Sequence, residues 1–344
     1  MGFSIEDFYY FKVELSDILK KFDNLPLDIY YYNTDNECYC LLAKKDKPVS
    51  FVIKYKGEKF IKKEDYSRYA EITYPENIKK KKIFEEMVED KKILNDEKIN
   101  AMYNYGDYTV EDSLLNPEDD KKIQAAKNFV NTSLKLIKRD LAIVDRLKHL
   151  EAYDLYTLRH SVNTFILASS FMNVLSMVDN SIDDNIINDI SNAVIFKDIG
   201  MLYIPRYILS KTNMLSDEEM EAIKSHPVKG YELFANKNIF SIKALHVIKF
   251  HHEKYNGTGY PEGLNKTDIP FFARITTICD TYDSLVSKKT YRNKMTCIDT
   301  INFMKKQMCG YFDPKLLDQF IVLLGPKNFI IKNLKEIEKK HLNN

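Results

Sequence analysis

The chain has 344 residues, of which 44% are hydrophobic and 29% are charged. This composition is typical of a globular protein, and it excludes fibrous, collagen-like and wholly disordered chains. The 51 lysines and arginines balance 50 acidic residues, so the net charge of +1 provides no global field that would attract duplex DNA or an anionic membrane. At this length we expect two domains.

The cysteines and the first residues bear on where the protein works. The five cysteines lack the spacing of a metal site or a disulfide framework, which favours a reducing compartment. The opening residues MGFSIEDFYYFK contain neither the basic nor the apolar segment of a secretion signal, and no run of about 18 apolar residues occurs. We therefore expect a cytoplasmic protein without a membrane span.

Residues 1–75 are predicted to form a small α/β domain, which is a candidate regulatory domain. Two runs rich in aromatic and aliphatic residues, Leu27–Tyr32 and Cys38–Ala43, flank a polar turn and predict a β-hairpin. A third strand is expected at Val49–Tyr55.

The rest of the chain has the pattern of helices joined by short loops. Residues 76–116 are rich in lysine and glutamate and predict a helical connector, broken at Tyr105-Gly106-Asp107. A long helix should begin near Pro117, and its apolar residues recur every three or four positions. These residues are Ile123, Ala126, Val130, Leu134, Ile137, Leu141 and Val144. We expect an all-α domain over residues 117–340, hence an α+β fold overall, and the helix at 118–150 is a candidate homodimer contact.

Histidines and aspartates in distinctive sequence contexts are the candidate metal ligands. Imidazole and carboxylate groups together suit borderline transition metals such as iron, manganese and zinc. The six candidates are His160, Asp198, His226, His251, His252 and Asp280.

The segment HHEKYNGTGYPEGL carries a specific resemblance. It follows an HP pair 25 residues upstream and precedes ARITTICDTYDSL and GYFDP. Between about Tyr153 and Leu324 the chain resembles the HD-GYP family of bacterial cyclic di-GMP phosphodiesterases. This resemblance implies a bundle of the HD superfamily, a signalling role, cyclic di-GMP as ligand, and bound divalent metal, most often iron or manganese.

The family pattern assigns the ligands to two metals, although one ligand is replaced here. It implies that His160 and Asp280 serve the first metal, that His226, His251 and His252 serve the second, and that Asp198 bridges the two. The histidine of the HD dipeptide is Lys197 in this chain. A phosphate-contacting lysine of the pattern is Met201, and a carboxylate ligand of trinuclear members is Tyr156. We therefore expect one or two ions and no third.

The resemblance also implies a set of ligand-binding residues. Within the GYP segment these are Gly259, Tyr260 and Pro261, and beyond it the basic residues Arg274, Lys289 and Arg292. The glycines allow the backbone to approach a ligand closely, and the tyrosine offers a ring and a hydroxyl to a guanine or a phosphate.

Lys197 decides between the possible activities. An ammonium repels a metal ion, and it can ligate only after losing its proton, so we expect Lys197 to pair with Asp198 or Asp280 in place of the first metal. Lys197 and Asp198 are the candidate catalytic residues. In two-metal hydrolysis both ions share the developing charge, so the loss of one ion should slow the reaction.

Three functions remain open from the sequence. The first is a cyclic di-GMP receptor with reduced or absent hydrolysis. The second is an active metal-dependent phosphodiesterase that converts cyclic di-GMP to linear pGpG or GMP with four ligands or an adapted Lys197. The third is an interaction module that recruits GGDEF-type partners.

Overall fold

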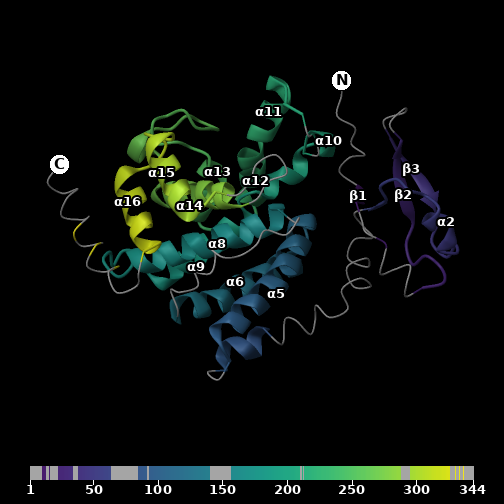
Figure 1. The fold of residues 1–344 in the computed structure, drawn as a ribbon, viewed down its shortest axis with the longest axis horizontal. Helices are drawn as coiled ribbons and strands as arrows, with labels where there is room; N and C mark the ends of the chain where they lie inside the picture. Colours follow the sequence, from purple (N-terminus) through teal and green to yellow (C-terminus); the bar gives the residue numbers. More distant parts are fainter. Residues whose placement is uncertain are drawn as a thin grey trace. The chain divides into compact units, whose positions relative to one another are not determined.

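The computed structural model describes residues 10–12, 15, 22–33, 38–62, 84–90, 93–139, 156–209, 211, 213–287, 295–325, 330, 333 and 336 (Figure 1). The chain divides into two compact units. One comprises residues 1–82 with 202–215, and the other comprises residues 83–201 with 216–344.

The first unit contains a four-stranded antiparallel sheet in the order β1-β4-β2-β3. Its strands are β1 (Tyr10–Lys12), β2 (Ile29–Asn33), β3 (Cys38–Ala43) and β4 (Phe60–Lys62). The strands β2 and β3 pair with Tyr31 opposite Cys40, where the sequence predicts a hairpin. Aromatic contacts join neighbouring strands, since the rings of Tyr32 on β2 and Tyr39 on β3 lie 5.0 Å apart.

The predicted strand at Val49–Tyr55 is wrong, because a single helical turn, α2 (Ser50–Ile53), occupies this segment. The carbonyl of Val49 accepts from the backbone N–H groups of Val52 and Ile53. Val52 is fully buried whereas Ile53 is 58% exposed, so one apolar side chain of the run reaches the core. Periodicity over so short a run does not separate a strand from a helix.

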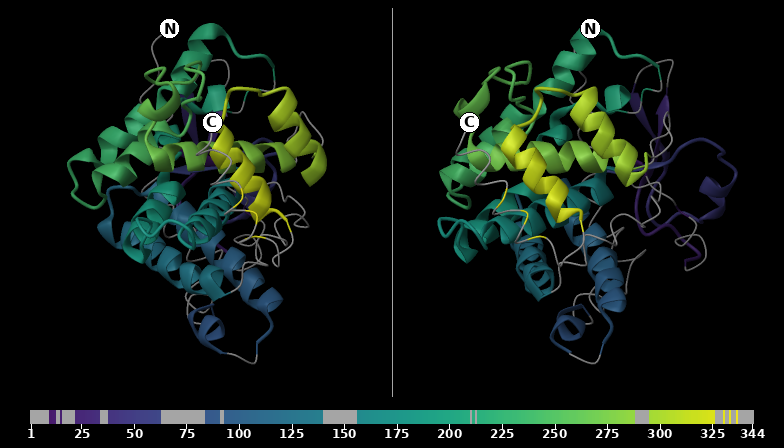
Figure 2. Two further views of the ribbon diagram at one scale, coloured as in Figure 1. Left: turned by 90° about the vertical axis from the view of Figure 1, so that its left-hand side faces the viewer. Right: turned by 60° about the vertical axis from the view of Figure 1, so that its left-hand side comes forward.

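The second unit is a bundle built around one central helix, and Figure 2 shows it from two further sides. Its first elements are α5 (Asn95–Leu115), α6 (Asp120–Arg139), α8 (Tyr156–Leu175), α9 (Asp184–Phe196) and η3 (Ile199–Tyr203). The short α10 (Arg206–Leu209), which follows η3 in the chain, belongs to the other unit. The later elements are α11 (Asp217–Lys224), α12 (His226–Ala235), α13 (Ile242–Phe250), η4 (Lys266–Asp268), α14 (Phe271–Val286), α15 (Cys297–Lys306) and α16 (Pro314–Leu323). Helix α8 packs against α5, α6, α9, α14 and α16.

The α+β class with an all-helical C-terminal domain is confirmed. In the described part of this unit, β pairing is limited to an isolated bridge between Asn256 and Asn265. The predicted apolar stripe of α6 is buried from Ile123 to Ile137, while Leu141 and Val144 lie outside the described residues. Within the described ranges, no helix combines the length and the apolar character that crossing a bilayer needs.

The predicted break at Gly106 is also wrong, because α5 runs through it without interruption. A Cβ atom at Gly106 would lie only 2.5 Å from the ring of Phe129 on α6. The glycine therefore lets α5 and α6 approach closely, and this packing outweighs its low helix propensity.

Candidate metal centre

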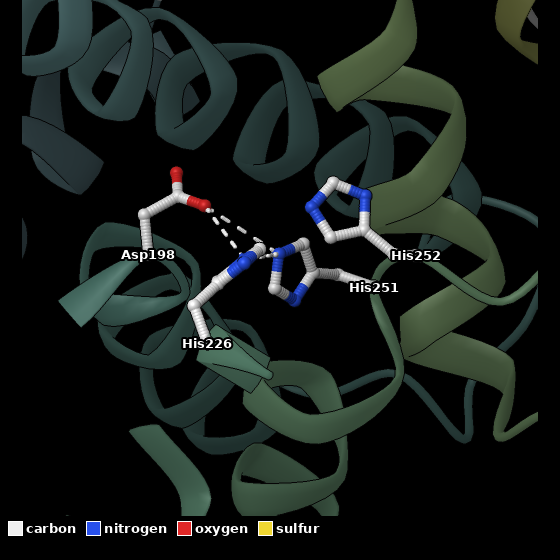
Figure 3. Close-up of side chains that lie close together, drawn as sticks. All are labelled: Asp198, His226, His251 and His252. Carbon is white, nitrogen blue, oxygen red and sulfur yellow. Dashed lines mark hydrogen bonds and ion pairs between the residues drawn. The ribbon is translucent and has the colours of Figure 1, made fainter. Parts of the chain in front are cut away.

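Three histidines and one aspartate converge at the ends of separate helices (Figure 3). Asp198 lies between α9 and η3, His226 is the first residue of α12, and His251 and His252 directly follow α13. One nitrogen or oxygen atom from each side chain lies within 4.8 Å of the others. The structure thus brings together the four residues that the family pattern assigns to the second metal.

Backbone contacts fix the distance between two of these ligands. A Cβ atom at Gly200 would lie 1.9 Å from the carbonyl oxygen of His226, which is far inside van der Waals contact. Only a glycine therefore allows η3 to lie against the start of α12. This contact sets the chain carrying Asp198 directly beside the residue that begins α12.

Hydrogen bonds orient the rings of His226 and His251 toward Asp198. Their Nδ1 atoms lie 2.8 Å and 2.9 Å from the carbonyl oxygens of Ile223 and Ile248. A carbonyl only accepts, so each Nδ1 carries a hydrogen and each ring turns its Nε2 toward Asp198.

The resulting arrangement fits a cation. The two Nε2 atoms lie 3.4 Å apart, and each lies 3.5 Å from Oδ1 of Asp198. Burial lowers the pKa of His251 and holds the pKa of His252 well below its usual value, so both rings are neutral near pH 7. Neutral imidazoles facing a carboxylate are the ligand form that iron, manganese or zinc requires.

Lys197 fills the position beside this cluster. Its side chain is fully buried at the end of α9, its ammonium pairs with Asp198, and its Nζ lies 2.8 Å from Oδ1 of Asp280. Burial would lower the pKa of Lys197, but the two carboxylates outweigh burial and raise it. The pKa values of Asp198 and Asp280 are lowered despite burial, chiefly by the same ammonium.

A second metal does not fit beside the ammonium. His160, Asp198 and Asp280 also lie close enough together to hold an ion. However, both carboxylates of this group are already paired with Lys197, and His160 Nε2 lies 2.9 Å from the same Asp280 oxygen. The buried ammonium balances the two carboxylates as the first metal would, and it offers no open coordination position.

His160 should make the metal-free chain less stable as pH rises. Burial and Lys197 lower the pKa of His160, but Asp280 and Asp283 outweigh them and raise it to about 10. Because the unfolded value is near 6.5, this stabilisation is complete below pH ~6.5 and is lost toward pH ~10. Urea unfolding in chelator should show a decline of up to ~1.4 kcal/mol per pH unit that His160→Gln lacks. Identical slopes for the two chains would contradict the assignment.

The loop after the histidine pair is anchored by Glu253. Its Oε1 accepts from the backbone N–H groups of Glu262 and Gly263 at 2.7 Å and 3.0 Å. A Cβ atom at Gly259 would lie 2.3 Å from the nitrogen of Lys254, so the loop folds back onto its own start. This fold stacks the ring of Tyr260 on His252 with centroids 4.8 Å apart.

The remaining predicted ligand-binding residues belong to several parts of the chain. The guanidinium of Arg274 donates to the carbonyl of Ile269 at 3.1 Å and pairs with Asp313, so it ties α14 to the start of α16. Pro261 follows Tyr260 in the loop, and Met201 is half-buried in η3. Lys289, Arg292 and the side chain of Tyr156 lie outside the described residues.

Two polar residues of the site were not singled out from the sequence. Asp283 Oδ2 lies 2.7 Å from Nδ1 of His160, and Asn163 Nδ2 donates to Asp283 Oδ1 at 2.9 Å. Each lies three positions after a predicted ligand on the same helix, so helical spacing could have indicated them.

Comparisons with known proteins show the family of the helical part of the chain. The HD domain profile matches residues 143–316. The cyclic di-GMP phosphodiesterase PA4108 of Pseudomonas aeruginosa is 30% identical over 179 residues, which cover 52% of this chain and 42% of that protein. The cyclic di-GMP phosphodiesterase response regulator RpfG of Xanthomonas campestris pv. campestris is 29% identical over 207 residues, 58% of this chain and 54% of that protein. The chain thus spans about half the length of these curated relatives.

A solved structure shows the same fold. Bd1817, an HDG"Y"P protein from Bdellovibrio bacteriovorus, matches with a TM-score of 0.56 at 17% sequence identity. The match covers 94% of this chain and 99% of that chain. The profile match, which covers about half of the chain, shows that the chain belongs to the HD domain family, and its likeness to the two relatives supports the HD-GYP group of that family.

Proposed function

We propose that the chain is a metal-dependent cyclic di-GMP phosphodiesterase that works with one metal ion and a buried ammonium in place of the second. The observation that carries this proposal is the pairing of Lys197 with Asp198 and Asp280 beside an intact cluster of four ligands. The relatives named as cyclic di-GMP phosphodiesterases support the substrate and the reaction type.

Asp198, His226, His251 and His252 would hold the ion, with iron or manganese as the leading candidates. When bound, such an ion supplies a Lewis acid and a water of lowered pKa for attack on a phosphodiester. The two oxygens of Asp198 have different partners. Oδ1 faces His226 and His251, and Oδ2 pairs with Lys197. The ammonium therefore keeps the shared carboxylate in place.

Lys197 limits the rate because an ammonium cannot coordinate a phosphate or a water as a metal ion does. Its side chain is fully buried and its hydrogen-bonding capacity is directed at two carboxylates. It therefore balances charge but does not present a coordination position to a phosphate or a water. We expect hydrolysis that is slower than a two-metal site would give.

Tyr260 supports a nucleotide as the substrate. Its ring stacks on His252, and burial raises the pKa of its hydroxyl, which therefore stays protonated. A ring and a hydroxyl donor beside the ion would suit a guanine base or a phosphate oxygen.

A receptor without turnover is the second candidate, and Lys197 favours it for the same reason that it slows hydrolysis. One experiment distinguishes the phosphodiesterase from the receptor. It uses the full chain, loaded anaerobically with Mn²⁺ or Fe²⁺. Metal would be counted by mass spectrometry and products separated by chromatography.

We expect about one ion per chain and chelator-sensitive conversion of cyclic di-GMP to linear pGpG. His251→Ala should remove both the ion and the turnover, whereas His246→Ala, on α13 outside the cluster, should remove neither. Binding of cyclic di-GMP without product over repeated assays would establish the receptor instead.

Glu253→Ala should weaken nucleotide binding more than it weakens the metal site. It removes the acceptor of two backbone N–H groups, which should cost about 2–3 kcal/mol of stability and free Tyr260 from its stack. We expect at least ~5-fold weaker cyclic di-GMP binding by calorimetry, with the ion retained. Glu232→Ala, an exposed glutamate on α12, is the matched control. Unchanged nucleotide affinity in Glu253→Ala would exclude the loop as part of the binding site.

A further inference from the structure

A line of hydrogen bonds joins the connector helix α5 to the metal centre. The hydroxyl of Tyr103 on α5 lies 2.9 Å from Oδ1 of Asn163 on α8. The Nδ2 of Asn163 lies 2.9 Å from Asp283 on α14, whose other oxygen lies 2.7 Å from Nδ1 of His160. His160 in turn reaches Asp280, the carboxylate that pairs with Lys197.

The direction of each bond in this line is fixed by chemistry. An ionised carboxylate only accepts, so Asn163 must turn its NH₂ group toward Asp283 and its carbonyl toward Tyr103. Burial raises the pKa of Tyr103 well above its usual value, so the hydroxyl keeps the proton that it donates. Because a carboxylate oxygen faces each ring nitrogen, His160 donates from Nδ1 to Asp283 and from Nε2 to Asp280.

Two members of the line are buried. Tyr103 is 2% exposed and Asp283 is 3% exposed. Arg159 lies over the ring of Tyr103 at 4.9 Å and pairs with Asp107, one turn further along α5, at 2.6 Å. Tyr103 thus contacts α8 twice: its hydroxyl bonds Asn163, and its ring lies against Arg159.

We propose that Tyr103 and Asn163 are positioning residues, which act through Asp283 to hold His160 and the Asp280–Lys197 pair in their working arrangement. This inference rests on the proposed function for its effect on turnover. Carboxylates and amides behind the residues of a metal site commonly change activity 10–100-fold when they are removed. Here Tyr103, at the opposite end of the line from Lys197, comes from α5, a helix that contributes no predicted ligand.

The test compares two tyrosines of the same helix. Tyr103→Phe removes the hydroxyl that donates to Asn163, and Tyr105→Phe removes a buried hydroxyl that lies outside the line. Each variant loses one buried hydroxyl, so the two should lose similar stability, about 1 kcal/mol. A difference between the two variants at the metal centre therefore reports the loss of the hydrogen-bond line and not a general loss of stability.

The first readout is the proton resonance of His160 Nδ1–H in the full chain without metal, which reports the hydrogen bond to Asp283. We expect Tyr103→Phe and Asn163→Leu to shift or broaden this resonance, and Tyr105→Phe to leave it in place. The second readout is the kinetics of the metal-loaded chain, where Tyr103→Phe should lower kcat ~10-fold with KM unchanged.

An unchanged His160 resonance in Tyr103→Phe would overturn the inference whatever the activity, and so would a shifted resonance with an unchanged kcat. A shifted resonance in a chain whose wild type hydrolyses no cyclic di-GMP would support the hydrogen-bond line and overturn the proposed function. The two proposals therefore fail separately.

Discussion

Replacing Lys197 with histidine should raise the metal content by about one ion per chain and speed hydrolysis of cyclic di-GMP at least ~10-fold. The variant removes the ammonium that pairs with Asp198 and Asp280 and supplies a neutral imidazole beside His160. A ~10-fold gain needs only ~1.4 kcal/mol off the barrier, which is modest for the recovery of a Lewis acid. Metal analysis and a turnover assay measure the two effects.

Lys243→His, at an exposed lysine on α13, is the matched control and should change neither quantity. Adding Met201→Lys to Lys197→His should help further by restoring a phosphate contact, and the two gains need not add because both groups act on one transition state. If the wild-type chain already holds two ions and turns over as fast as the double variant, the ammonium does not displace a metal.

Asp198→Asn should empty the metal centre and destabilise the metal-free chain. The substitution removes the only carboxylate of the four-ligand cluster and one of the two partners of Lys197. We expect metal content to fall from about one ion to near zero and turnover to fall ~10³-fold, since a Lewis acid is worth several kcal/mol. Leaving a buried ammonium half-paired should also cost about 3 kcal/mol of stability.

Urea unfolding in chelator measures the stability loss without the contribution of the metal. Asp189→Asn, at a half-buried aspartate on α9, should cost less than ~0.5 kcal/mol and leave the ion in place. An Asp198→Asn chain that keeps its ion would show that the cluster is held together by the histidines alone. Unchanged stability in chelator would show that Asp280 alone satisfies Lys197.

The sequence predicted the metal centre better than it predicted the surroundings of that centre. His226, His251 and Asp198 lie in short strings that carry the HD-GYP resemblance, which implied one shared site, and the structure places them together. The polar residues behind His160 come from helices far apart in the sequence: Tyr103 is 60 positions from Asn163, and Asn163 is 120 from Asp283. Helical spacing could indicate Asn163 and Asp283 one by one, but their contact with each other and with Tyr103 follows from helix packing, which no local pattern reports.

The two errors in secondary structure show the limits of local preference. Gly106 is a helix breaker by propensity, but close packing on Phe129 keeps it inside α5, where it outweighs a preference of about 1 kcal/mol. The run at Val49–Tyr55 is β-like in composition, but the carbonyl of Val49 accepts from the N–H groups of Val52 and Ile53, which closes one turn of α2.

The contact between Gly200 and the start of α12 explains how this centre can lose a ligand and keep its shape. The main chain that carries Asp198 is held beside the start of α12 by this backbone contact, which does not involve the side chain at position 197. A change of histidine to lysine there alters the charge and the chemistry of the pocket but leaves its scaffold intact. We therefore expect Lys197→His to change the charge of the pocket while the backbone of the candidate centre stays in place.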